Sequence, residues 1–256
     1  MSINIKKFCK TNNFKYLDNL TINEKKEVRT VLGSILQKKL VVKNTNVLEL
    51  LLTYFFREME NRDKKWIIKN TIGKPGKEGS GYIVYEVNHP ETEYVMKEFK
   101  PKKSFDKVRN EVLFQTIASL YEISPKILEY GRKPNPYIIM EKMNGGNISE
   151  VIMRQNGKLT LDQQQQLIKI YDTLDKIKIH HNDFNILNLM FNNNKLYIID
   201  YGMSKILNEN TSNFSALELA LITMSGYQRF LKEPPMLLLP YLNDLHKNYW
   251  LSRNKN

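Results

Sequence analysis

The stretch that decides the fold is HNDFNILN at residues 181–188, followed further along the chain by DYG at residues 200–202. Each segment places carboxylate or amide side chains at the border of an apolar run. Asparagine and aspartate also gather where a chain only forms a turn, so HNDFNILN alone does not distinguish a turn from a functional site. The two segments together, in this order, are more informative.

The residues between these segments predict a β-hairpin. Asn192–Asn194 lies between two short apolar runs, Leu189–Phe191 and Leu196–Ile199, and asparagine tolerates the backbone angles of a tight turn. Pairing of the two runs would bring Asp200 back beside Asn188. One amide oxygen and one carboxylate would then meet, and Mg²⁺ accepts such ligands together with a nucleotide.

Periodicity elsewhere predicts a mixed α+β chain. Alternating apolar residues predict strands that form a small antiparallel sheet, and longer amphipathic stretches predict helices at about 105–121 and 161–176. The expected strands are Trp66–Ile68, Tyr82–Val87, Tyr94–Phe99 and Tyr137–Met140.

Three parts are expected along the 256 residues. Residues 1–65 form a helical extension, in which TINE at residues 21–24 is a capping-box candidate. Residues 66–143 are rich in strands, and residues 144–256 are mainly helical. The extension either braces the next part or serves as a docking or regulatory segment.

A glycine-rich loop, IGKPGKEGSG at residues 72–81, lies between two of the expected strands. Glycine lets backbone N–H groups approach phosphates closely, although a plain hairpin has a similar composition. A strand on each side excludes the P-loop and the dinucleotide fingerprint, because both lead into a helix. The glycines concerned are Gly73, Gly76, Gly79 and Gly81.

Lys97 lies on the same strand face as Val95 and Phe99. A lysine on an apolar face needs a partner or a ligand, unless it lies at an exposed edge. The adjacent Glu98 should point to the opposite face. Glu111, on the helix that follows this strand, is the expected partner.

In order and spacing, HNDFNILN and DYG resemble the H-R-D-x-x-x-x-N catalytic loop and the D-F-G motif of the protein-kinase superfamily. The resemblance covers about residues 66–205 and implies a bilobal fold with a β-sheet N-lobe and a reduced, mainly α C-lobe. It also implies that Asp183 orients the acceptor hydroxyl. Asn188 and Asp200 would hold Mg²⁺, or Mn²⁺ in its place.

The same resemblance implies how ATP is bound. Lys97 would contact the phosphates as part of the catalytic set, Glu111 would hold Lys97, and the glycine-rich loop would cover the phosphates. Backbone groups near Glu141 and Met143 would bind adenine, and Met140 would guard the back of its pocket.

Several departures from the kinase pattern bear on regulation and substrate. Asn182 replaces the arginine that usually reads an activation-loop phosphate, and no A-P-E segment follows Gly202. Asn185 replaces a lysine of Ser/Thr kinases, as in choline and aminoglycoside kinases. Short kinases of this kind are similar to kinase-like proteins of large DNA viruses and to truncated bacterial effector kinases.

The leading hypothesis is a minimal serine/threonine-type protein kinase that uses ATP and Mg²⁺. Its expected partners are a protein substrate and an activating host protein. The alternatives are a small-molecule kinase of the choline or aminoglycoside type and a pseudokinase that serves as an interaction module.

Composition adds weaker expectations. A net charge of +12 would attract nucleic acid or acidic lipids, but the charges are scattered and a Lys-, Asn- and Ile-rich composition follows from an AT-biased genome. Nucleic-acid binding is therefore ranked last. A single cysteine, Cys9, the lack of an apolar signal sequence and apolar runs far below roughly 20 residues predict a cytoplasmic protein without a membrane span.

Overall fold

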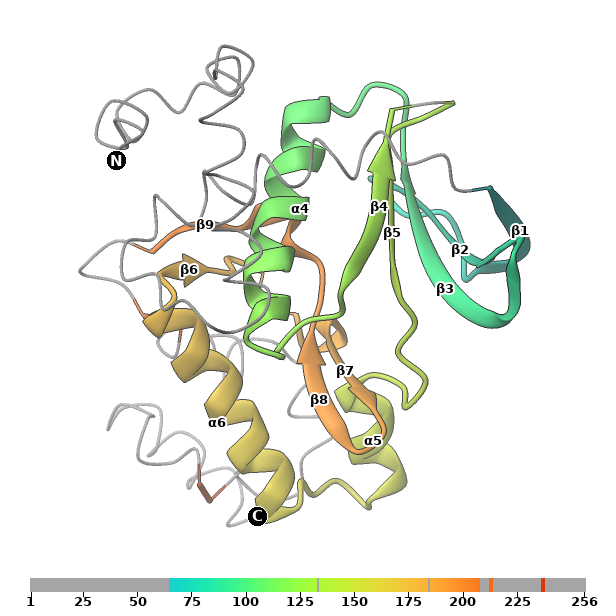
Figure 1. Cartoon of the computed structure of the whole chain (residues 1–256). Helices are drawn as coiled ribbons and strands as arrows, with labels where there is room; N and C mark the ends of the chain where they lie inside the picture. The colour runs from blue at the N-terminus through green and yellow to red at the C-terminus, as the bar shows by residue number, and fades with distance from the viewer. Residues whose placement is uncertain (1–64, 133, 184, 208–211, 214–235, 238–256) are drawn as a thin grey trace. The chain divides into compact units, whose positions relative to one another are not determined.

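The computed structural model describes residues 65–132, 134–183, 185–207, 212–213 and 236–237 (Figure 1). The helices expected within residues 1–65 lie outside this part. The chain divides into two units: Met1–Leu120 with Lys126–Lys142, and Tyr121–Pro125 with Met143–Asn256.

The first unit is built on a five-stranded antiparallel sheet of order β1-β2-β3-β5-β4. Helix α4 (Phe105–Leu120) packs against β4 and β5. The strands are β1 (Trp66–Ile72), β2 (Gly79–Glu86), β3 (His89–Phe99), β4 (Ile127–Gly131) and β5 (Tyr137–Glu141). The expected antiparallel sheet is therefore confirmed, with β4 as a strand that the sequence did not predict.

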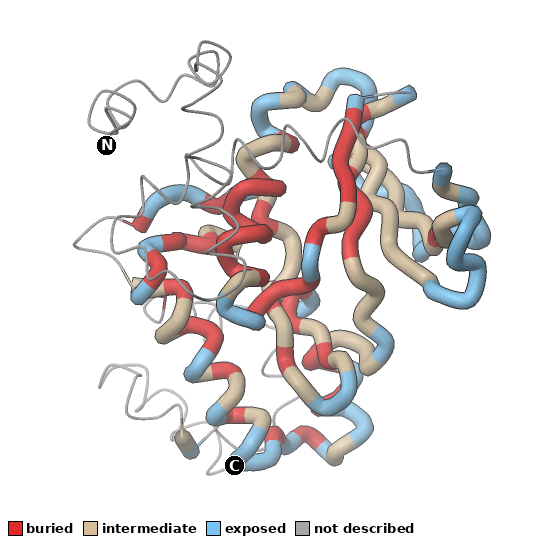
Figure 2. Tube along the Cα trace, in the orientation of Figure 1, coloured by how far each residue is buried: buried red, intermediate tan, exposed pale blue. Residues whose placement is uncertain are grey.

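Burial differs sharply across this sheet (Figure 2). The edge strand β1 is largely exposed, whereas β4 and β5 are largely buried. Ile138 and Ile139, which point to opposite faces of β5, are both fully buried. The core of the unit thus lies around β5 and α4.

Helix α4 buries polar residues together with apolar ones. Val108 and Val112 are fully buried, and so are Glu111 and Gln115 on the same face of the helix. A helix that only supported the sheet would bury apolar side chains there, because a buried polar group without a partner is costly. Glu111 and Gln115 on this face of α4 therefore require polar partners.

The second unit contains two helices that begin with complete capping boxes. In α5 (Ile148–Arg154) the box joins Asn147 and Glu150, and in α6 (Leu161–Lys176) it joins Thr160 and Gln163. The helix predicted at residues 161–176 is confirmed, and α5 lies in the part of the chain that was expected to be mainly helical. The described part of this unit also contains four short strands: β6 (Ile179–His180), β7 (Leu189–Asn192), β8 (Lys195–Ile198) and β9 (Lys205–Ile206).

Strands β7 and β8 form the hairpin that the sequence predicted. Leu189 pairs with Ile198 and Asn192 with Lys195 in an antiparallel register. The turn residues Asn193 and Asn194 have φ of 49° and 61°. Two positive φ values in a two-residue loop suit the right-handed twist of the strands, and asparagine tolerates them.

No helix in the part of the chain that the structure describes combines the length and apolarity needed to cross a membrane.

The glycines of the 72–81 segment are expected to differ in their effect on stability. A Cβ at Gly79 would lie 1.9 Å from the carbonyl oxygen of Glu98 on β3, whereas a Cβ at Gly76 would meet nothing closer than 3.7 Å. We expect Gly79→Ala to lower the free energy of unfolding by about 2 kcal/mol, because β2 and β3 must separate. Gly76→Ala is the matched control, with a much smaller effect. Equal unfolding curves in urea for the two variants would contradict the register of β2 on β3.

Candidate active site

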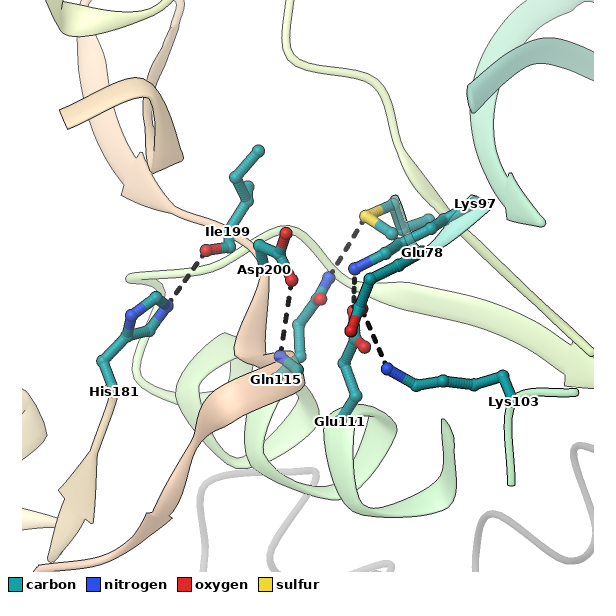
Figure 3. A network of polar contacts seen from close by, with 10 residues as sticks. Glu78, Lys97, Lys103, Glu111, Gln115, His181, Ile199 and Asp200 are labelled. Atoms are coloured by element: carbon teal, nitrogen blue, oxygen red, sulfur yellow. Dashed lines mark hydrogen bonds and ion pairs between the residues drawn. The ribbon is translucent and has the colours of Figure 1, made fainter. Parts of the chain in front are cut away.

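The site residues of the first unit centre on an ion pair between β3 and α4. Lys97 Nζ donates to Glu111 Oε1 at 2.6 Å, and the Glu111 side chain is fully buried while that of Lys97 is 22% exposed (Figure 3). The ammonium also lies 5.1 Å from the centre of the Phe99 ring, on the same strand face. The structure thus brings together the lysine and the glutamate that the sequence paired.

Strand β3 holds Lys97 between two neighbours. Gly81 on β2 and Ile138 on β5 are its register partners, so Lys97 is not on an edge strand. Glu98 makes a different contact, accepting a hydrogen bond from Asn135 at 3.1 Å. The reading of Lys97 as an exposed edge lysine is therefore wrong.

A second polar residue of α4 was missed from the sequence. Gln115, one turn after Glu111 and fully buried, donates from Nε2 to Met140 Sδ at 3.4 Å. The helix thus directs one polar group toward β3 and another toward β5. The only sequence signal was the i, i+4 spacing of Glu111 and Gln115 in a helix of apolar residues.

The glycine-rich loop is an exposed connection between β1 and β2. Gly73 has φ of +62°, which glycine adopts without strain, and the N–H of Gly76 donates to the carbonyl of Gly79 at 2.8 Å. Glu78 of this loop forms an ion pair with Lys103, with 2.8 Å between Oε2 and Nζ. In this conformation the Gly76 N–H serves the turn, and the contact of the loop with phosphates stays a prediction.

The two residues expected beside adenine fall on either side of the division between the units. Glu141 ends β5 in the first unit, and Met143 begins the second. The N–H of Glu141 donates to the carbonyl of Lys126 at 3.0 Å. That N–H is therefore already engaged, and an adenine ring would need other backbone groups of this segment.

In the second unit, the residue before Asp200 is held on both sides. The N–H of Ile199 donates to the carbonyl of Asn188 at 2.9 Å, and the carbonyl of Ile199 lies 3.0 Å from His181 Nε2 (Figure 3). The other ring nitrogen of His181 lies 2.8 Å from the carbonyl of Asp183. Backbone contacts thus tie HNDFNILN to DYG, as the hairpin predicted.

In both Asp183 and Asp200 the side-chain carboxylate is oriented by a hydrogen bond from a backbone N–H two residues further along the chain. Asp183 Oδ1 accepts from the N–H of Asn185 at 3.3 Å, and Asp200 Oδ1 accepts from the N–H of Gly202 at 3.4 Å. Asp200 has φ of 65°, a left-handed conformation that is uncommon for a residue other than glycine. Such a conformation persists where the surroundings hold the backbone, and the preceding residue, Ile199, has both its N–H and its carbonyl engaged.

Asn188 is suited to a metal. Its side chain is buried, and within the described residues the Nδ2 atom has no hydrogen-bond partner. Rotation of the amide by 180° exchanges N and O, which would place an oxygen in that position. The described residues contain no group of three or more His, Cys, Asp or Glu placed to hold a metal. Binding of Mg²⁺ by Asn188 and Asp200 stays a prediction, in which phosphates and water would supply the other ligands.

The histidines of this region are buried. Burial lowers the pKa of His181, and its hydrogen bonds to the carbonyls of Ile199 and Asp183 act in the opposite direction. Burial also lowers the pKa of His180, with Lys205 adding to the effect. Through these two bonds His181 connects the loop to the strand that precedes Asp200.

A cavity of about 550 Å³ in the second unit lies elsewhere. Its walls include Arg154 and Gln155 at the C-terminal end of α5, Asp162 and Gln163 of α6, and Asn193 and Asn194 of the hairpin turn. It contains none of the predicted site residues.

No protein-family model matches the sequence. Three curated relatives do match it. The probable serine/threonine-protein kinase YbdM of Bacillus subtilis is 29% identical over 126 residues, and mitogen-activated protein kinase kinase 7 of Arabidopsis thaliana is 30% identical over 137 residues. The putative serine/threonine-protein kinase L232 of Acanthamoeba polyphaga mimivirus is 25% identical over 140 residues. The chain is thus distantly similar to protein kinases over about half of its length.

The kinase relatives are matched only in part. The matches cover 46%, 50% and 49% of this chain, and 49%, 45% and 21% of the respective relatives. The chain thus spans half or less of the length of these kinases. One of them comes from a large DNA virus, the group that the sequence resembled.

Lys97 and Glu111 should be strongly coupled in their effect on stability. Lys97→Met leaves the Glu111 carboxylate buried and unpaired, so we expect the free energy of unfolding to fall by about 3 kcal/mol. The double variant Lys97→Met/Glu111→Leu should recover most of this loss. Urea titration measures both. Lys69→Met, which removes an exposed contact to Glu93, is the control and should lower the free energy of unfolding far less. A loss in Lys97→Met no larger than in the control would refute the coupling.

Stability should fall as the pH is lowered from 7.5 to 5.5. The pKa values of His180 and His181 are lowered in the folded state, so the unfolded chain binds more protons near pH 6 and the folded state is disfavoured there. The Glu93 carboxylate, whose pKa is lowered to about 2 by Lys142 and Lys69, begins to contribute only at lower pH. Differential scanning calorimetry between pH 7.5 and 5.5 measures how Tm depends on pH, and His180→Leu should reduce this dependence. A constant or rising Tm would be inconsistent with neutral buried rings.

Proposed function

We propose that the chain is an ATP- and Mg²⁺-dependent phosphotransferase, and specifically a minimal serine/threonine-type protein kinase. The Lys97–Glu111 ion pair carries the proposal, because a fully buried carboxylate at 2.6 Å from a lysine is costly to the fold and is required for kinase chemistry. The serine/threonine kinases named among the relatives support it.

Each residue has a defined role in this proposal. Lys97, oriented by Glu111, neutralises charge on the ATP phosphates. Asp183, whose Oδ1 is oriented by the N–H of Asn185, accepts the hydrogen bond of the acceptor hydroxyl and aligns its oxygen. Mg²⁺, held by Asn188 and Asp200, offsets the negative charge that the phosphates carry during transfer.

The proposed organisation follows the same family. Residues 66–143 form the N-lobe and residues 144–256 a reduced C-lobe, with residues 1–65 as an extension. The function requires both units to present their groups to one nucleotide. We also propose that the kinase acts in the cytoplasm on a protein substrate, with an activating host protein as a further partner.

One observation favours a small-molecule acceptor as the second candidate. Asn185 stands where Ser/Thr kinases carry a lysine, and its Oδ1 accepts from the N–H of Leu187 at 3.0 Å, capping the 3-10 helix Ile186–Asn188. The side chain is thus engaged with the backbone of its own loop. Choline and aminoglycoside kinases share this substitution, so their substrate class is the alternative.

Transfer of labelled phosphate from ATP to a panel of proteins tests the proposal. We expect Asp183→Ala to lower kcat about 10³-fold, because the hydroxyl loses its acceptor. Asp162→Asn, a change of an exposed carboxylate in the same unit, is the control and should leave the rate unchanged. Transfer that is equal in wild type and Asp183→Ala, or that is absent from wild type, would refute the proposal.

The acceptor class is tested by competition. Wild-type protein is offered a mixture of proteins and a panel of hydroxylated metabolites with limiting labelled ATP. Label on protein supports the leading proposal, whereas turnover of a metabolite that proteins do not match would move the assignment to a small-molecule kinase.

A further inference from the structure

Strand β1, which leads into the glycine-rich loop, contains one residue more than the strand beside it. Ile68 pairs with Val84 on β2, and the register resumes with Asn70 opposite Ile83. Lys69 is therefore the extra residue of a β-bulge. Because side chains alternate along a strand, a bulge of one residue reverses which face of the sheet the following residues present.

The bulge brings Ile72, the last residue of β1, to the face of the sheet that carries Lys97. Ile72 pairs with Gly81 on β2, and Gly81 pairs with Lys97 on β3, so the three residues form one row on one face. In a regular strand Trp66 would share this face with Ile72, because six residues separate them. Trp66 lies on the opposite face instead, where its ring packs edge-on against Tyr94 with 5.4 Å between ring centres. The bulge thus sets the side of the sheet on which the glycine-rich loop begins.

On the Lys97 face, an ion pair holds the bulged residue. Lys69 Nζ lies 2.6 Å from Glu93 Oε1, and Lys142 Nζ lies 2.6 Å from the other oxygen of the same carboxylate. Glu93 precedes Lys97 by four residues on β3, so both side chains lie on this face. The Lys69 side chain is half exposed, and such a pair adds little to overall stability. Its effect is local, because it fixes the direction of the extra residue.

On the opposite face, Trp66 reaches across the sheet to a buried carboxylate. Its Nε1 donates to Glu129 Oε2 at 2.8 Å, although β1 and β4 are the two edge strands of the sheet. Tyr137 Oη donates to the other oxygen of Glu129, which is only 3% exposed. A Cβ at Gly131 would lie 2.6 Å from the Tyr137 ring, so glycine leaves room for this ring over β4. Burial of a carboxylate is costly, and the two donors offset part of that cost.

We propose that four side chains form a register lock, which positions the start of the glycine-rich loop on the Lys97 face: Trp66, Lys69, Glu93 and Glu129. This role rests on the proposed kinase function, in which the loop covers the ATP phosphates. Strand β1 is an edge strand, paired on one side only, and it is exposed at every position after its first. Backbone pairing with β2 alone therefore specifies its register weakly. A slip of one residue would separate Trp66 from Glu129 and turn Ile72 away from Lys97, and the four side chains oppose that slip.

Kinetics test Trp66 as a positioning residue. Trp66→Ala should raise KM for ATP about tenfold and leave kcat within about threefold, because the glycine-rich loop loses its fixed place while the HND loop is untouched. Ile68→Ala is the matched control, since Ile68 lies on the same face of the same strand, is 54% exposed and takes no part in the register lock. Its KM should stay near that of wild type. A folded Trp66→Ala with wild-type KM overturns the proposal.

A milder variant guards against a protein that fails to fold. Trp66→Phe keeps an aromatic ring but loses the N–H that binds Glu129 Oε2, so KM for ATP should rise about threefold. If Trp66→Ala does not fold, an unchanged KM in Trp66→Phe overturns the proposal in its place.

The bulge itself is tested by deletion of Lys69. The shortened strand alternates regularly, so Trp66 and Ile72 cannot both keep their faces, and KM for ATP should rise on the order of tenfold or more. Lys69→Met keeps the extra residue and loses only an exposed ion pair, so its KM should rise by about twofold at most. A folded deletion variant with the KM of wild type contradicts the role of the bulge.

Hydrogen exchange tests the register lock without any activity. Backbone amides of β1 should exchange about tenfold faster in Trp66→Ala than in wild type, whereas amides of α6 in the second unit should stay unchanged. Equal exchange of β1 in the two proteins overturns the proposal even where phosphate transfer is observed. Faster exchange in the variant, together with no transfer by wild type, supports the register lock and refutes only the kinase assignment.

Discussion

The backbone of Ile199 is the point on which the second unit depends. Its N–H binds the Asn188 carbonyl, and its carbonyl lies within hydrogen-bond distance of the His181 ring. These two contacts fix both ends of the HND loop to the residue before Asp200. Without them, Asp183, Asn188 and Asp200 would lie on two independent loops, and the left-handed conformation of Asp200 would lack support.

Neighbouring contacts extend this constraint into the core. The His181 ring packs edge-on against Tyr201 with 4.8 Å between ring centres, and Tyr201 is fully buried. Burial raises the pKa of the Tyr201 hydroxyl. The N–H of Ile198 donates to the carbonyl of Ile123 at 2.9 Å, so the hairpin is also bonded to the segment before β4. The geometry of the loop is therefore set by buried contacts.

Both units bury polar side chains where a plain scaffold would bury apolar ones. Glu111 and Gln115 on α4, and His181, Asn188 and Asn213 in the second unit, are all at least nine-tenths buried. Burying such groups is unfavourable unless each finds a partner, so they concentrate where function requires them. The pairing of Lys97 with Glu111 and of Asn213 with Asp175 offsets part of this cost.

The sequence predicted those parts of the site that depend on local patterns. Asparagine's tolerance of positive φ predicted the hairpin that ties Asn188 to Ile199, and strand alternation put Lys97 on the face of Phe99. Glu111 followed from its place on the next helix. These contacts are local or pass between adjacent elements, so residue type and spacing carry the information.

The remaining contacts could not be predicted in this way. Asn213 binds His181 across 32 positions, and no periodicity relates the two residues. Gln115 meets Met140 only because β5 lies beside β3 in the strand order, which no local pattern specifies. The same applies to β4, whose pairing depends on β5. Contacts that depend on the order of strands or on residues far apart in the sequence therefore became known only from the structure.

The most direct test of the central claim is a crystal structure of the protein with a non-hydrolysable ATP analogue and Mg²⁺. The account predicts a metal bound by the Asn188 side-chain oxygen and the Asp200 carboxylate, with Lys97 Nζ on the phosphates and still paired with Glu111. A nucleotide bound elsewhere, or bound without metal contact to Asn188 and Asp200, would contradict it.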